Sequence, residues 1–119
     1  MSNLNTVDDC LFCKISSGAI PVDVVIETEN AIAFRDIDPK APTHVLVIPK
    51  AHFADVTELS ASNPNLAGEL LALAAEVAKQ EGLAKGYRIV TNNGEDAGQS
   101  VAHVHFHVLG GRSLSWPPG

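Results

Sequence analysis

Three histidines alternate near the end of the chain, and they carry the strongest chemical signal in the sequence. His103, His105 and His107 are each separated by one residue within the β-favouring run 101–109. If this run is a strand, the three imidazoles share one face, at about 7 Å between neighbours. Imidazole can serve as acid, base, nucleophile or metal ligand near neutral pH. A surface strand with solvated histidines is the alternative, which the apolar residues at both ends of the row disfavour.

The spacing of the row limits what its histidines can do together. Neighbours about 7 Å apart are awkward ligands for one zinc ion, whose Zn–N bonds are near 2.1 Å. One histidine can instead hold a metal while the next attacks phosphorus as the unprotonated imidazole. The polar loop 92–100 precedes the row, and its neutral amides and hydroxyls can bind a phosphate without a basic cluster. Ordinary turn formation is the alternative role for the glycines of this loop.

The two cysteines of the chain, Cys10 and Cys13, form a C-x-x-C pair. In a reducing compartment this spacing indicates metal or redox chemistry more often than a structural disulfide. A redox pair normally opens a helix after a strand, and no strand-like run precedes Cys10. A metal site is therefore the better prediction, and it needs two further ligands.

Composition limits the class of protein. The 119 residues include 45% hydrophobic residues, enough for the core of one domain spanning residues 1–119. Lys and Arg number 8 against 14 Asp and Glu, which gives a formal net charge of −6. This balance argues against nucleic-acid binding by a basic field, but it leaves room for one small phosphorylated ligand.

From the sequence pattern we expect no segment that directs the chain to a membrane or out of the cell. Residues 1–9 are polar and acidic and lack the pattern of a signal peptide. The most apolar stretch, 66–78, is interrupted by Glu69 and Glu76. We therefore expect a soluble, cytoplasmic protein that does not bind membranes.

The remaining chain must supply the elements that position these residues. Helical spacing of Leu66, Leu70 and Val77 predicts a helix that begins at Asn63-Pro64 and ends near Gly82 or Gly86. A short helix is predicted over 11–17, and strands over 24–28, 31–36, 43–48, 87–91 and 101–109. In 43–48, His44, Leu46 and Ile48 share one face. Strands with inserted helices and no regular βαβ alternation indicate an α+β fold.

Residues 103–109 resemble the signature of the histidine-triad (HIT) superfamily. The surrounding chain resembles its Hint branch, the purine nucleoside phosphoramidases. Stretches that carry the resemblance are 11–15, 34–37, 42–50, 92–94, 98–100, 109–112 and 116–119. The resemblance implies a HIT-like antiparallel sheet of about five strands with two helices, extended across a homodimer.

The resemblance also implies a reaction. It is the hydrolysis of purine nucleoside 5′-phosphoramidates, at a P–N bond, through a nucleotidyl-histidine intermediate. Superfamily transferases usually resemble His-x-His-x-Gln, so His107 favours a hydrolase. A dinucleoside polyphosphate hydrolase of the Fhit type and a zinc-stabilised nucleotide-binding or scaffold protein are the alternatives.

Site residues follow from the same resemblance by position. His105 would be the nucleophile, His107 would bond backbone and phosphate, His44 would support the row, and Ser100 would assist the leaving amine. The implied nucleotide-binding residues are Asp36, Ile37, Asn92, Gly98, Gln99, Ser100, His105, His107, Phe12, Ile15 and Leu46. Asp36 would bind the ribose hydroxyls and the apolar residues would surround the purine, although core packing explains each of these equally well.

Some HIT relatives bind structural zinc, and the matching positions here are Cys10, Cys13, His52 and His103. Two thiolates and two imidazoles form a closed tetrahedral set suited to zinc. The alternative is a pair of reduced thiols without metal. No motif in the sequence indicates a catalytic metal.

Overall fold

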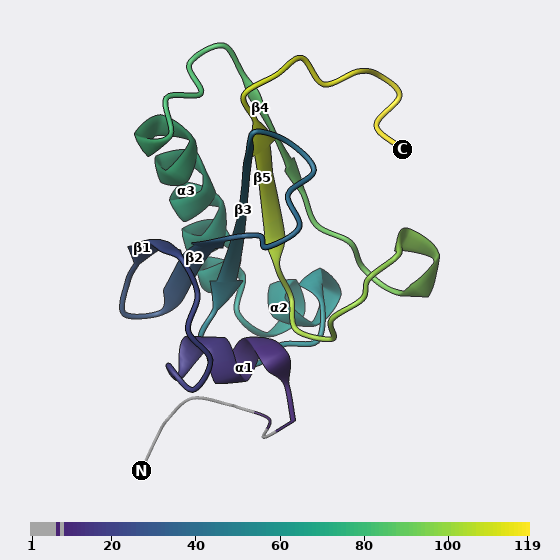
Figure 1. Ribbon diagram of the computed structural model, residues 1–119. Coiled ribbons are helices and arrows are strands. Elements are labelled where there is room, and N and C mark those ends of the chain that lie inside the picture. The colour runs from purple at the N-terminus through teal and green to yellow at the C-terminus, as the bar shows by residue number, and fades with distance from the viewer. Residues whose placement is uncertain (1–6, 8) are drawn as a thin grey trace.

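Five strands form one antiparallel sheet, which is the scaffold of the candidate site (Figure 1). The computed structural model describes residue 7 and residues 9–119. The strands lie in the order β1-β2-β3-β5-β4 and each neighbouring pair is antiparallel. Their bounds are β1 Val24–Glu27, β2 Ala31–Arg35, β3 Thr43–Pro49, β4 Tyr87–Val90 and β5 Phe106–Gly110. The predicted α+β class and five-stranded sheet are confirmed.

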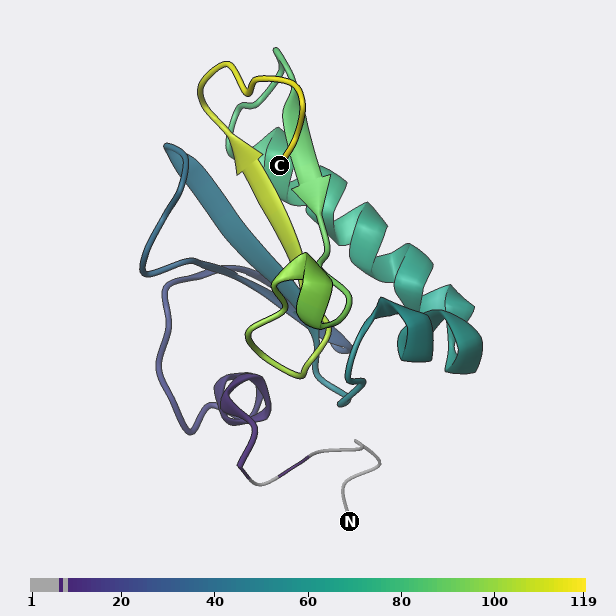
Figure 2. The same cartoon turned by 90° about the vertical axis from the view of Figure 1, so that its right-hand side faces the viewer.

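The two faces of the sheet are covered by different helices. Helix α3 (Pro64–Gln80) lies along one face and packs on β2, β3 and β5 (Figure 2). Helix α1 (Leu11–Ser16) packs on the opposite face, where Phe12 and Ile15 meet Phe34 and Leu46. Because both faces are covered, the central strand β3 is buried along its whole length.

The long predicted helix is confirmed as α3. Asn63 caps it, since its side-chain oxygen accepts the N–H of Leu66 at 3.1 Å, and Pro64 takes the first position. The helix ends at Gln80, just before Gly82, which has a φ of 73°.

The described residues contain three α-helices, one more than predicted. Helix α2 (Val56–Ser62) begins at the cap Asp55, whose side chain accepts the N–H of Glu58 at 2.9 Å. The Glu58 carboxylate accepts the N–H of Ala54 at 2.9 Å. This D-x-x-E pattern is a helix-start signal in the sequence that the prediction overlooked.

The prediction of a continuous strand over 101–109 is wrong in its first half, because β5 begins only at Phe106. The β3–β5 ladder stops at the Val47–Phe106 pair. Pro49, which ends β3, has no N–H for a further rung. The N–H of Val104 instead donates to the carbonyl of Phe53 at 2.7 Å. His103 and His105 therefore lie on a bent segment, and only His107 lies on the strand.

In residues 7 and 9–119, no helix is long and apolar enough to cross a membrane. The expectation about a signal peptide concerns residues 1–6 and 8, which lie outside the described part. At the other end, the Arg88 guanidinium donates to the Ser115 carbonyl at 2.9 Å and lies 5.9 Å from the Trp116 ring centre.

Candidate active site and metal centre

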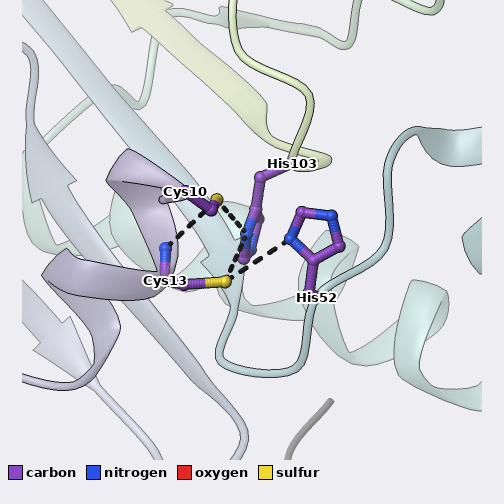
Figure 3. A group of neighbouring side chains, drawn as sticks. All are labelled: Cys10, Cys13, His52 and His103. Carbon is purple, nitrogen blue, oxygen red and sulfur yellow. Dashed lines mark hydrogen bonds between the residues drawn. The ribbon is translucent and has the colours of Figure 1, made fainter. Parts of the chain in front are cut away.

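Two cysteines and two histidines from three separate segments converge beside helix α1 (Figure 3). Cys10 caps α1 and Cys13 lies on its first turn, while His52 follows β3 and His103 precedes β5. Their ligand atoms all lie within 4.8 Å of one another. The Sγ of Cys13 is 3.4 Å from Nδ1 of His52, and the Sγ of Cys10 is 3.3 Å from Nδ1 of His103. The four residues predicted as zinc ligands are thus brought together.

The protonation pattern of this cluster fits a zinc ion. Nε2 of His103 donates to the carbonyl of Pro49 at 2.9 Å, so its bare Nδ1 faces both sulfurs. His103 is fully buried, and a main-chain partner of this kind fixes a ligand ring in place. Burial raises the pKa of the Cys13 thiol, a cost that a bound cation reverses by stabilising the thiolate.

His105 has the tautomer that a nucleophile requires. Its Nδ1 lies 2.8 Å from the carbonyl of His103, so Nδ1 carries the hydrogen and Nε2 holds a free lone pair. Thr91 holds the carbonyl of His105 through a 2.8 Å hydrogen bond from its hydroxyl, and the ring of Phe12 packs edge-on at 5.0 Å between centres. Burial lowers the pKa of His105, so the imidazole is neutral at pH 7.

His107 lies next to His105, and its side chain contacts that of His44 on the neighbouring strand β3. The ring centres of His105 and His107 are 5.0 Å apart. Nδ1 of His107 lies 2.9 Å from Nε2 of His44, and a carboxylate oxygen of Asp36 lies 3.5 Å from the same Nε2. Burial, together with the neighbouring histidines, lowers the pKa of His107 to about 4. Burial also lowers the pKa of His44, so both rings are neutral at pH 7.

The polar loop 92–100 contains a short 3₁₀ turn, η1 (Glu95–Ala97), that ends at Gly98 with a φ of 81°. The Gln99 amide nitrogen donates to the carbonyls of Ala54 and Val101, at 2.7 and 3.0 Å. Its oxygen accepts the N–H of Gly94 at 2.8 Å. The Gln99 side chain therefore holds the loop in shape. Among the other predicted residues of this loop, Ser100 is exposed and Asn92 is half-buried.

The apolar residues predicted to surround the base divide into two groups. Phe12, Ile15 and Leu46 are buried in one small core cluster, as the core-packing alternative expects. Ile37 is instead 96% exposed, beside Asp36. Of the buried three, Phe12 also packs against the His105 ring, so it shapes the site directly.

Three residues at the site escape prediction from the sequence. Thr91 bonds the His105 carbonyl, the main-chain N–H of Lys40 bonds His44, and Arg112 bonds the Lys40 carbonyl. A hydroxyl at a strand end gives a weak signal at best. A main-chain N–H gives none, because almost every residue has one.

Known proteins resemble this chain over most of its length. A family profile described as HIT domain matches residues 17–114. A 14 kDa zinc-binding protein of Zea mays is 48% identical over 120 residues, covering 98% of this chain and 94% of that protein. The crystal structure of a HIT family hydrolase from Legionella pneumophila Philadelphia 1 has a TM-score of 0.90 and 49% identity, covering 93% and 100%. A histidine triad nucleotide-binding protein from Candida albicans has a TM-score of 0.79 and 35% identity, covering 92% and 83%.

Proposed function

The chain belongs to the HIT domain family, and from that we propose that it is a nucleotide-binding hydrolase that cleaves purine nucleoside 5′-phosphoramidates. The observation that carries the proposal is the buried, neutral His105, whose Nδ1 is held by the His103 carbonyl and whose Nε2 is free to attack. The hydrolase and nucleotide-binding relatives support the coarser activity. The assignment of a P–N bond as the bond that is cleaved rests on the resemblance to the Hint branch.

The reaction proceeds in two balanced steps. Nε2 of His105 attacks the α-phosphorus, a P–N bond to the ring forms, and the bond to the leaving amine breaks with its electron pair on nitrogen. Ser100 relays a proton from solvent to that amine, and His107 bonds a phosphoryl oxygen. Water then attacks phosphorus, the P–N bond to His105 breaks with its electron pair on Nε2, and the proton that water loses returns to solvent. This step frees His105 and the nucleoside monophosphate.

The nucleotide lies beside the histidines in this proposal. Asp36 binds the ribose hydroxyls, and the exposed Ile37 with Phe12, Ile15 and Leu46 flanks the purine. The loop that Gln99 holds in shape offers main-chain N–H groups at Gly98 and Ser100, and the Asn92 amide, to the phosphate. A homodimer that extends the sheet belongs to the same proposal.

Zinc has a structural role. The convergence of Cys10, Cys13, His52 and His103, and the zinc-binding relative from Zea mays, both support it. Zinc at this site would cross-link α1 to the segment that follows β3, through His52, and to the segment that carries His105, through His103. This would be a contribution to folding and not a step of the reaction.

Comparative turnover tests the proposed substrate class. Purified protein receives an AMP–amine adduct or diadenosine triphosphate at equal concentration, with His105→Asn as the matched control for contaminating activity. We expect faster hydrolysis of the adduct and none by the variant. Faster hydrolysis of diadenosine triphosphate would favour the Fhit type. Nucleotide binding without hydrolysis of either would favour the scaffold.

A further inference from the structure

The hydrogen bond between His44 and His107 has a fixed direction, and a residue outside the predicted site fixes it. The main-chain N–H of Lys40 donates to Nδ1 of His44 at 3.0 Å. A main-chain N–H can only donate, so Nδ1 accepts and the hydrogen of the neutral ring lies on Nε2. That Nε2 faces Nδ1 of His107 at 2.9 Å, which therefore accepts in turn.

The same reasoning places the ring hydrogen of His107 on its Nε2. This atom is buried and, among the residues that the structure describes, has no hydrogen-bond partner. Buried polar groups nearly always have partners, so a lone buried donor beside the nucleophile indicates a ligand acceptor. Burial lowers the pKa of His107 to about 4, so the ring donates as neutral imidazole at pH 7.

The opposite direction is chemically unfavourable. A hydrogen on Nδ1 of His44 would face the N–H of Lys40, and two donors would meet at 3.0 Å. The same conflict weighs against a metal ion between Asp36, His44 and His107, although their ligand atoms also lie within 4.8 Å of one another. A metal there would need a bare Nε2 on His44 and hence a hydrogen on its Nδ1.

Lys40 is itself held by the segment that follows β5. The Arg112 guanidinium donates to the Lys40 carbonyl at 3.0 Å. Arg112 follows Gly111, whose φ of 90° turns the chain back over Pro42. The loop on the other side of Lys40 is fixed too, because the N–H of Asp38 donates to an Asp36 carboxylate oxygen at 2.8 Å.

We propose that Lys40, through its main-chain amide, and Arg112, which holds Lys40, are positioning residues that present His107 to the substrate as an Nε2–H donor. The identity of the acceptor, a phosphoryl oxygen, rests on the proposed function. The direction of the hydrogen bonds does not, because it follows from the protein's own donors and acceptors.

Nuclear magnetic resonance of ¹⁵N-histidine-labelled protein at neutral pH tests the direction without any substrate. The ring-nitrogen spectra report which nitrogen of each imidazole carries the hydrogen. We expect Nε2–H on both His44 and His107. A hydrogen on Nδ1 of either ring in the wild-type protein would overturn the proposal. Failure of the phosphoramidase assay would leave this result unaffected, so the two proposals fail separately.

Variants test the two positioning residues. In Arg112→Ala we expect mixed tautomers at His44 and an at least roughly tenfold slower formation of the nucleotidyl enzyme, as for loss of one hydrogen bond to a charged group. Arg88→Ala is the matched control, since it releases the same segment at Ser115 without a contact to Lys40. Equal effects of the two variants on the His44 tautomer would overturn the role of Arg112.

A proline tests the amide itself. Lys40→Pro removes the N–H that bonds His44, whereas Lys40→Ala retains it. We expect a single His44 tautomer in the alanine variant and a mixture in the proline variant. Identical spectra from both folded variants would refute the role of the amide. If the proline variant does not fold, the wild-type and Arg112→Ala spectra decide the question.

Discussion

His105 Nδ1 donates to the main-chain carbonyl of His103 at 2.8 Å, so a predicted zinc ligand orients the predicted nucleophile. His103 uses different atoms for metal binding and for orienting His105. His103 turns Nδ1 toward the cysteine sulfurs and its carbonyl toward His105. His103 therefore joins the candidate metal centre directly to the proposed nucleophile.

Zinc should be present and should stabilise the fold. Protein purified without a polyhistidine tag is expected to hold about one zinc ion per chain by mass spectrometry. Chelation should lower Tm by at least about 5 °C, because about 1 kcal/mol of lost stability shifts Tm by that amount in a domain of this size. Less than about a tenth of an equivalent of zinc, in the absence of chelators, would contradict the assignment.

The lowered pKa of His107 predicts that the stability of the fold depends on pH. Its folded pKa of about 4 lies below the ordinary 6.5, so the unfolded chain binds more protons between these values. The free energy of unfolding is therefore unaffected by this group above 6.5 and decreases as pH falls from 6.5 toward 4. His107→Gln lacks the titrating group. Urea denaturation across this range should show a shallower decrease for the variant, and parallel curves would count against the buried neutral ring.

The Gln99 side chain should stabilise the loop 92–100. Gln99→Ala leaves the Ala54 and Val101 carbonyls and the Gly94 N–H without this partner, at a cost of about 1–3 kcal/mol. Gln99→Glu keeps the size but cannot donate, so it should be at least as damaging. Urea denaturation measures both variants. If Gln99→Glu is as stable as wild type, the amide does not hold the loop.

Two glycine substitutions should have opposite effects. Gly111 has a φ of 90°, and an added Cβ would lie 2.8 Å from the Pro42 side chain, so Gly111→Ala should destabilise the fold by more than about 1 kcal/mol. Gly68 lies inside α3 with open space around it, so Gly68→Ala should stabilise by about 0.5–1 kcal/mol. Thermal unfolding gives both signs. A stabilising Gly111→Ala would contradict the requirement for glycine at the turn beside Arg112.

The sequence predicts those features that arise from local pattern and residue type. Helix α3 follows from its apolar spacing and its Asn63-Pro64 start. Alternation on β3 correctly places Leu46 and Ile48 on one face and Val45 and Val47 on the other. The Cys and His types, read through the family resemblance, select the four residues that converge at the metal centre.

Other features depend on tertiary contacts that the pattern does not contain. Alternation of the three histidines predicts a full strand, but Val104 pairs with Phe53 outside the sheet and the ladder ends at Phe106. The roles of Lys40 and Arg112 depend on main-chain atoms that only folding brings together.

The covalent role of His105 is the central claim, and trapping of the intermediate tests it most directly. Protein is mixed with an AMP phosphoramidate in a single turnover, quenched, digested and mapped by mass spectrometry under conditions that preserve P–N bonds. The account predicts adenylyl label on His105 Nε2 and none in His105→Asn. Label on another residue, or turnover by His105→Asn at the wild-type rate, would contradict it.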